Sequence, residues 1–225
     1  MAIPRTPAAT AAPLDFGPTL PTLLRRRFGV RERVTVATAV ALLALAAAAL
    51  LYSLLTGPEK LTYRAGPTFN IQYSGDVLKR VAPFDGELVR LEAHRGSLDA
   101  SITVTRLHLP PFPGNVTSGL LPVYEGSYVR HLRQTLPAFQ QRDEGSARLT
   151  DAQGYQVGFR AGPVGRHTWG RDILLVPRDE DVQEGVVLHF RYTTAGPPSK
   201  REASALDQVR KAFRSFNFGT DAAKW

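Results

Sequence analysis

The sequence of 225 residues contains no cysteine. It therefore forms no disulfide, no thiolate metal site and no thiol nucleophile, and it offers no cysteine for lipid attachment. A domain of this chain that lies outside the cytoplasm has to be held together by its hydrophobic core.

The sequence also lacks the residue spacings that catalysis and metal binding usually require. None of its five histidines occurs in H-E-x-x-H or at another metal-ligand spacing. No serine lies in a G-x-S-x-G turn, and the segment Gly162–Gly165 has no lysine of a phosphate-binding loop. We therefore expect no metal, no cofactor and no enzymatic activity.

The net charge of +8 is unevenly distributed along the chain. Its first 56 residues hold six arginines and lysines against two acids, a net of +4, while the remaining residues hold 22 basic and 18 acidic residues, also +4. No basic run interleaved with aromatic residues occurs in the second part. The high pI therefore does not indicate nucleic-acid binding, and no nucleic-acid partner is expected.

One long apolar run stands near the N-terminus. The segment Val34–Leu55 contains 22 residues and no charge, so as a helix it would span about 33 Å. A hydrocarbon core is about 30 Å thick. The run predicts a transmembrane helix over 34–55, preceded by a disordered, proline- and alanine-rich tail with a basic juxtamembrane segment over 1–33.

The flanking charges predict the orientation of this helix. Within about 20 residues of the helix, five arginines precede it and only Lys60 and Arg64 follow it. The positive-inside rule then places the N-terminus in the cytoplasm and the rest of the chain outside it, as a single-pass protein of the cell membrane. The same side chains are positioned to contact lipid headgroups: Arg25, Arg26, Arg27, Arg31 and Arg33.

Two other fates of the apolar run remain open. In a cleavable signal peptide the small-residue exit would follow the apolar region, but here leucines follow the run Ala46–Ala49. Arg25–Phe28 also fits the R-R-x-F core of a twin-arginine export signal. We favour an uncleaved signal anchor.

From Thr68 onward the apolar residues alternate with polar ones. The alternation runs over Phe69–Tyr73, Val89–Ala93 and Leu98–Val104, and it returns in Tyr155–Phe159, Ile173–Val176 and Val186–Tyr192. Gly96 and Ser97 separate two of these strands and predict a hairpin. The pattern indicates an antiparallel sheet that is covered on one side.

Two amphipathic helices are predicted to cover the sheet. The first extends over Tyr124–Gln141, and Pro137 should end it early. The second starts at the capping box Ser199–Glu202 and buries Leu206, Val209, Phe213 and Phe216. The fold class is therefore α+β, with a linker over 56–67, an extracytoplasmic domain over 68–218 and a tail over 219–225.

This order of elements resembles the Mog1/PsbP-like superfamily. The likeness covers Tyr63 to Phe218 and rests on the opening strand, the paired strands that end near Leu109, the two helices and the closing Ser215-Phe216-Asn217-Phe218. The superfamily includes photosystem accessory proteins, a Ran-binding protein and bacterial lipoproteins. The resemblance implies a non-catalytic accessory or binding module, but it carries over no functional residue.

The most suggestive stretch for recognition is His108–Pro122, because long loops in compact domains are often functional. In one interpretation it displays Phe112, Leu120 and Leu121 to a partner, and in the other the leucines pack over the core. Trp169, in a predicted glycine-rich turn, is a second contact. The candidate partner-binding residues are Pro110, Pro111, Phe112, Pro113, Leu120, Leu121 and Trp169.

Two functions remain after these exclusions. The first is a membrane-anchored extracytoplasmic binding or accessory module for a protein partner in the cell envelope. The second is a carrier or sensor of an amphiphile such as a lipid, which would use a cavity between sheet and helix.

Overall fold

The structure is a computed structural model that describes residues 30–55, 57–163, 165–177 and 184–220. The chain divides into two units, Met1–Thr56 and Gly57–Trp225. The described part of the first unit is one helix, and that of the second is an α+β domain with two antiparallel sheets. The predicted fold class is therefore confirmed.

Helix α2 (Val30–Leu55) has 26 residues, a length of about 39 Å. Its segment Thr35–Tyr52 is long and apolar enough to cross a membrane, and the side chains of this segment are exposed. The helix begins four residues before the predicted Val34 and so includes Arg31 and Arg33. The other three arginines of the predicted basic segment, Arg25, Arg26 and Arg27, lie outside the described residues.

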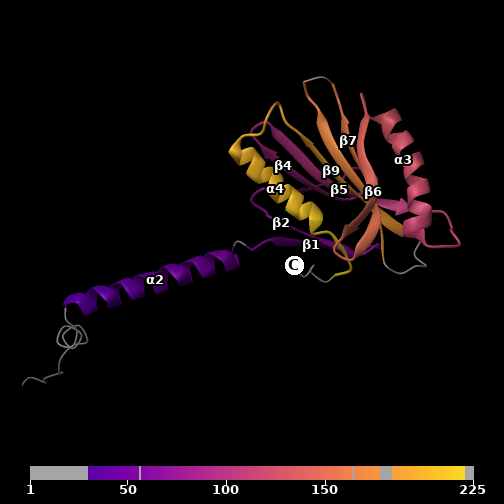
Figure 1. Ribbon diagram of the computed structural model, residues 1–225. Helices are drawn as coiled ribbons and strands as arrows, with labels where there is room; N and C mark the ends of the chain where they lie inside the picture. The colour runs from indigo at the N-terminus through magenta and orange to yellow at the C-terminus, as the bar shows by residue number, and fades with distance from the viewer. Residues whose placement is uncertain (1–29, 56, 164, 178–183, 221–225) are drawn as a thin grey trace, which may run out of the picture. The chain divides into compact units, whose positions relative to one another are not determined.

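The second unit contains a small sheet and a large one (Figure 1). The small sheet has the order β1-β2-β10, formed by β1 (Glu59–Tyr63), β2 (Phe69–Tyr73) and β10 (Asn217–Phe218). The large sheet has the order β3-β4-β5-β9-β8-β7-β6. Its strands are β3 (Lys79–Val81), β4 (Glu87–Arg95), β5 (Leu98–His108), β6 (Gln140–Leu149), β7 (Ala152–Ala161), β8 (Thr168–Val176) and β9 (Glu184–Thr193).

Strand β8 shows that both faces of the large sheet are buried. Ile173 and Leu175 belong to one hydrophobic cluster, while Leu174 and Val176 belong to another. Since successive side chains of a strand point to opposite faces, the two clusters lie on opposite sides of the sheet. A continuous apolar run is typical of a strand that is covered on both faces.

Helix α4 (Lys200–Arg214) covers the first face together with the small sheet. Its predicted capping box is present, because Ser199 Oγ accepts from the Glu202 amide and Glu202 accepts from the Ser199 amide. Glu202 also accepts from the amide and the hydroxyl of Ser97 in the β4–β5 turn. These backbone donors lower the pKa of Glu202 to about 2.

Helix α3 (Leu121–Thr135) covers the opposite face, where Val129 and Leu132 pack on β7. The two helices therefore lie on opposite faces of the large sheet. The prediction that both helices cover the same face is wrong. The reason is that the central strands are apolar on both faces. Figure 1 shows α4 across β4 and α3 beside β6 and β7.

Several predicted boundaries are wrong. Helix α3 starts three residues before Tyr124, with Pro122 in its first turn. It ends at Thr135, shortly before Pro137, which confirms the prediction that Pro137 ends it early. Strand β6 was not predicted, because its N-terminal half is polar on both faces. Strand β1 lies inside the predicted linker over 56–67, where its Leu61 is buried against β2. The folded unit thus begins before residue 68.

Candidate functional site

A half-open cleft of about 570 Å³ lies between α4 and the strands β6, β7, β8 and β9. We call it the arginine cleft, because five arginines line it: Arg142, Arg148, Arg171, Arg210 and Arg214. Five aromatic residues also line it: Trp169 is exposed and Tyr192 is half-buried, whereas Phe159, Phe190 and Phe213 are buried.

Small residues on β6 and β7 leave the space of the cleft unfilled. Ala147 of β6 and Gly158 of β7 line it, and Gly145 has no heavy atom within 4 Å of the position that a Cβ would take. The carboxylate of Asp143 lies over Gly158, where a Cβ would come within 2.3 Å of Oδ1. Bulky side chains at these positions would fill the space that the cleft leaves open.

The wall opposite is the C-terminal half of α4. Phe213 is buried and packs on Phe190 of β9, with ring centroids 5.4 Å apart. Arg210 precedes Phe213 by three residues, so the two lie on the same side of the helix. Arg214 follows Phe213 directly. Both arginines are exposed and line the cleft.

Trp169 and Tyr192 lie side by side on the cleft wall, with ring centroids 6.5 Å apart and nearly parallel planes. The guanidinium of Arg210 lies 5.9 Å from the Tyr192 ring, and that of Arg142 lies 5.9 Å from the Trp169 ring. Guanidinium groups beside aromatic rings form a surface that holds carboxylates and flat groups together.

The charges of the cleft are unbalanced. Asp143 is the one acid among its lining residues, and its Oδ2 lies 3.1 Å from Arg171 Nη2. Five positive charges against one negative leave a net of +4. Among the described residues, Arg142, Arg210 and Arg214 form no ion pair with a carboxylate. The cleft is therefore built to attract negative charge.

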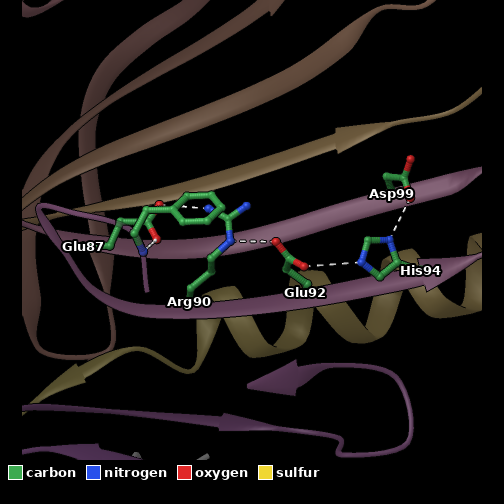
Figure 2. A network of polar contacts seen from close by, with 6 residues as sticks. Glu87, Arg90, Glu92, His94 and Asp99 are labelled. Atoms are coloured by element: carbon green, nitrogen blue, oxygen red, sulfur yellow. Dashed lines mark hydrogen bonds and ion pairs between the residues drawn. The ribbon is translucent and has the colours of Figure 1, made fainter. Parts of the chain in front are cut away.

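The other face of the sheet carries a row of alternating charges along β4, which continues to β5 (Figure 2). Arg90 forms ion pairs with Glu87 at 2.9 Å and with Glu92 at 2.6 Å. His94 lies 3.4 Å from Glu92 and 2.8 Å from Asp99. Opposite charges neutralise one another along this row, unlike the arginines of the cleft, and we interpret it as pairing on a solvated sheet face.

A buried ion pair joins α3 to the same face. Asp172 is fully buried and accepts from both Nη atoms of Arg191 and, at 2.7 Å, from the Tyr128 hydroxyl of α3. His189 Nδ1 lies 3.1 Å from the carboxylate. Burial alone would raise the pKa of Asp172, but Arg191 and His189 outweigh it and hold this pKa well below its usual range. Every member of the group has a partner, which is typical of a structural network.

The structure separates the residues that the sequence singled out. Pro110, Pro111 and Pro113 are exposed, and the Phe112 ring lies over Gly119 and is 39% exposed. Leu120 and Leu121 are buried against β8 and β9, which confirms the interpretation that they pack over the core. They are not available to a partner, because η1 (Val116–Leu120) and α3 turn them inward.

Trp169 lies in β8 and not in a turn, and it lines the arginine cleft on the opposite face from the loop. The prediction that Trp169 lies in a glycine-rich turn is therefore wrong. The five cleft arginines were not singled out in the sequence, because they come from three separate elements and each resembles an ordinary solvated arginine.

Comparison with known proteins gives similarity at the level of structure. No family model matches the chain, and no curated protein matches its sequence. Among solved structures, the chain is similar to LpqN of Mycobacterium tuberculosis, described as involved in cell envelope biogenesis, with 12% identity, 75% of this chain and 95% of that chain covered, and a TM-score of 0.45.

The chain is also similar to the cyanobacterial PsbP of Synechocystis sp. PCC 6803, with 13% identity, 73% and 94% of the two chains covered, and a TM-score of 0.47. A further similar structure is PA94 of Pseudomonas aeruginosa, a protein of unknown function, with 13% identity, coverage of 68% and 94%, and a TM-score of 0.38. A PsbP is thus among the similar structures, as the resemblance of the sequence predicts.

The row on β4 predicts the titration of His94. Hydrogen bonds to Asp99 and then to Glu92 raise the pKa of His94 above its ordinary value of 6.5. The stabilisation from these contacts is present below about pH 6.5 and is lost as the pH rises through the raised pKa. NMR titration of the imidazole should give a midpoint above 6.5 that Asp99→Asn lowers, whereas Asp207→Asn on α4 leaves it unchanged. A midpoint that Asp99→Asn does not move would contradict the assignment.

Proposed function

We propose that the protein is a single-pass membrane protein whose outer domain is a non-enzymatic accessory module that binds an acidic segment of a protein partner in the arginine cleft. The observation that supports this proposal is the charge of the cleft, where five arginines and a single aspartate lie beside the exposed ring of Trp169 and the half-buried ring of Tyr192. Among the described residues, these arginines have too few acidic neighbours to balance their charge. The carboxylates of a bound segment supply the missing negative charge.

Guanidinium groups suit this task. Each presents several N–H donors in a planar fork that matches a carboxylate in two-point contact. Arg210 and Arg214 project from α4, while Arg171 projects from the facing sheet. An acidic segment between them would be held from two sides, and the aromatic rings would pack against its carbon atoms.

The composition of the cleft supports binding over catalysis. Its described lining residues include no histidine, lysine or cysteine. Asp143 is the one carboxylate of the lining, but it is paired with Arg171 and points to the opposite face of β6 from Ser146. Ser146 is therefore not activated by this carboxylate, and a serine without a base is a weak nucleophile. Within the described residues, no group of three or more His, Cys, Asp or Glu could hold a metal ion.

A protein segment fits this cleft better than the acyl chain of a lipid. Sites for apolar molecules enclose most of the ligand surface among hydrophobic side chains. This cleft is half open and is lined by five charged arginines, so an acyl chain in it would desolvate guanidinium groups without pairing them.

The N-terminal helix sets where such binding takes place. Helix α2 is long and apolar enough to cross a membrane, and basic residues before it favour a cytoplasmic N-terminus, with the cleft on the far side. A tether of this kind raises the effective concentration of the module near membrane-bound partners. A cleft that binds weakly on its own is then sufficient for an accessory role.

The proposal predicts that reversing charge in the cleft weakens the binding of acidic peptides. The probe is an octapeptide of alternating Glu and Thr, and it is titrated into the full-length protein in detergent micelles. Arg210→Glu with Arg214→Glu should raise Kd at least tenfold, or about 1.4 kcal/mol, because two attractive contacts become repulsive. Binding of the wild type should also weaken with added salt.

Lys200→Glu with Arg201→Glu is the matched control. It makes the same charge change on the same helix, at two exposed positions of the first turn that do not line the cleft. Acidic side chains are favourable near a helix N-terminus, so the control should fold as the wild type does. Equal loss of binding in the two double variants would contradict a specific role of the cleft.

A variant that gains affinity provides the converse test. Asp143 holds Arg171 in an internal ion pair and is the one acid in the lining. Asp143→Asn removes this competitor and should lower Kd for the Glu-Thr peptide about two- to fivefold, since exposed ion pairs contribute below about 1 kcal/mol. Asp207→Asn removes an exposed acid of α4 that pairs with Lys211 outside the cleft, and it should change Kd less. An unchanged Kd for Asp143→Asn would count against Arg171 as a contact.

A further inference from the structure

Strand β6 forms one edge of the large sheet. It pairs with β7 and stands last in the strand order, and most of its side chains are exposed or half-buried. A strand that is paired on one side presents its remaining backbone N–H and C=O groups to whatever approaches the other side. Edge strands of this kind are templates for an additional strand.

Among the described residues no strand pairs with the outer edge of β6, and its pairing with β7 is in register over most of its length. The irregularity of pairing lies between Gln141 and Asp143. From Asp143, opposite Gly158, to Leu149, opposite Ala152, seven successive residues pair in unbroken register. Seven residues extend over about 23 Å, which matches the length of an ordinary strand.

The arginine cleft opens over this edge. Its lining includes Ser146, Ala147, Arg148 and Leu149 in succession. Consecutive residues of a strand point to opposite faces, so a cleft that touches all four of them reaches the edge itself and not one face alone. Charged residues protect many natural edges, but the segment Gly145–Ala147 in the middle of this edge carries none.

We infer that the acidic partner segment binds in extended conformation and adds to β6 as a further strand of the large sheet. This inference rests on the proposed function and adds the conformation and the sequence period of the ligand. Side chains of a strand alternate between faces, so every second residue of the segment faces α4. The segment recognised therefore has acidic residues at alternate positions. These residues all lie on the face toward α4, where they meet Arg210 and Arg214.

Selective methylation of the probe backbone tests strand addition. The amides of an added strand point alternately toward β6 and toward solvent. Two versions of the Glu-Thr octapeptide are compared, one methylated on the backbone nitrogens of its glutamates and the other on those of its threonines. One version should bind the full-length protein at least tenfold more weakly than the parent peptide, while the other stays within about threefold of it.

The outcomes separate this inference from the proposed function. Equal effects of the two methylation patterns, whether both retain or both lose binding, would overturn strand addition. If the parent peptide still depends on Arg210 and Arg214 in that case, the cleft remains the binding site. A parent peptide that does not bind at all would overturn both.

Hydrogen exchange of the protein supplies an independent readout. Strand addition should slow amide exchange at alternate residues between Asp143 and Leu149 at least tenfold when the peptide is bound, because only every second amide faces the free edge. The amides of α4 serve as an internal control, since the arginine side chains bind without changing helical hydrogen bonds. Unchanged exchange along β6 in the presence of saturating peptide would contradict the inference.

Discussion

The packing of Phe213 of α4 against Phe190 of β9 helps to position one wall of the arginine cleft. It is one of the points where the helix packs on the large sheet, with ring centroids 5.4 Å apart and both rings buried. Replacing a buried phenylalanine by alanine typically costs about 3–5 kcal/mol. The same contact holds Arg210 and Arg214 opposite the strands, so the packing of the core and the geometry of the cleft are not independent.

Both faces of the large sheet contribute to this arrangement. On one face the small sheet and α4 bury the largest hydrophobic cluster. On the other face the hydroxyl of Tyr128 in α3 donates a hydrogen bond to Asp172, which is paired with Arg191. Helix α4 has its main sheet contacts with β2, β4 and β5, so the outer strand β6 extends beyond its cover. The cleft lies where this cover ends, and small residues on β6 and β7 leave it open.

The sequence predicts features that depend on a repeating pattern. The capping box and the stripe Leu206–Val209–Phe213 define α4 because helical periodicity and capping are local. The β4–β5 hairpin follows from alternation around Gly96 and Ser97. The resemblance of the sequence to PsbP-like proteins rests on the same order of elements and identifies no functional residue.

Features that depend on tertiary proximity are not visible in the sequence. Strand β6 was missed because an edge strand with few buried residues shows no apolar alternation. The cleft was missed because its arginines come from β6, β8 and α4, which only folding brings together. The role of Leu120 and Leu121 is also not decided by the sequence. Adjacent leucines have the same sequence pattern in a binding loop and at the start of a buried helix.

Site-specific photocrosslinking in the living cell tests directly whether the arginine cleft binds a protein. A benzophenone amino acid in place of Trp169, which lines the cleft and is exposed, is compared with the same residue at Ser127, which is exposed on α3 and does not line the cleft. We predict that the probe at position 169 captures a protein through an acidic stretch, that Arg210→Glu with Arg214→Glu abolishes this product, and that the probe at position 127 does not yield it. Capture of lipid alone from position 169, or of the same protein equally from both positions, would contradict binding of a protein in the cleft.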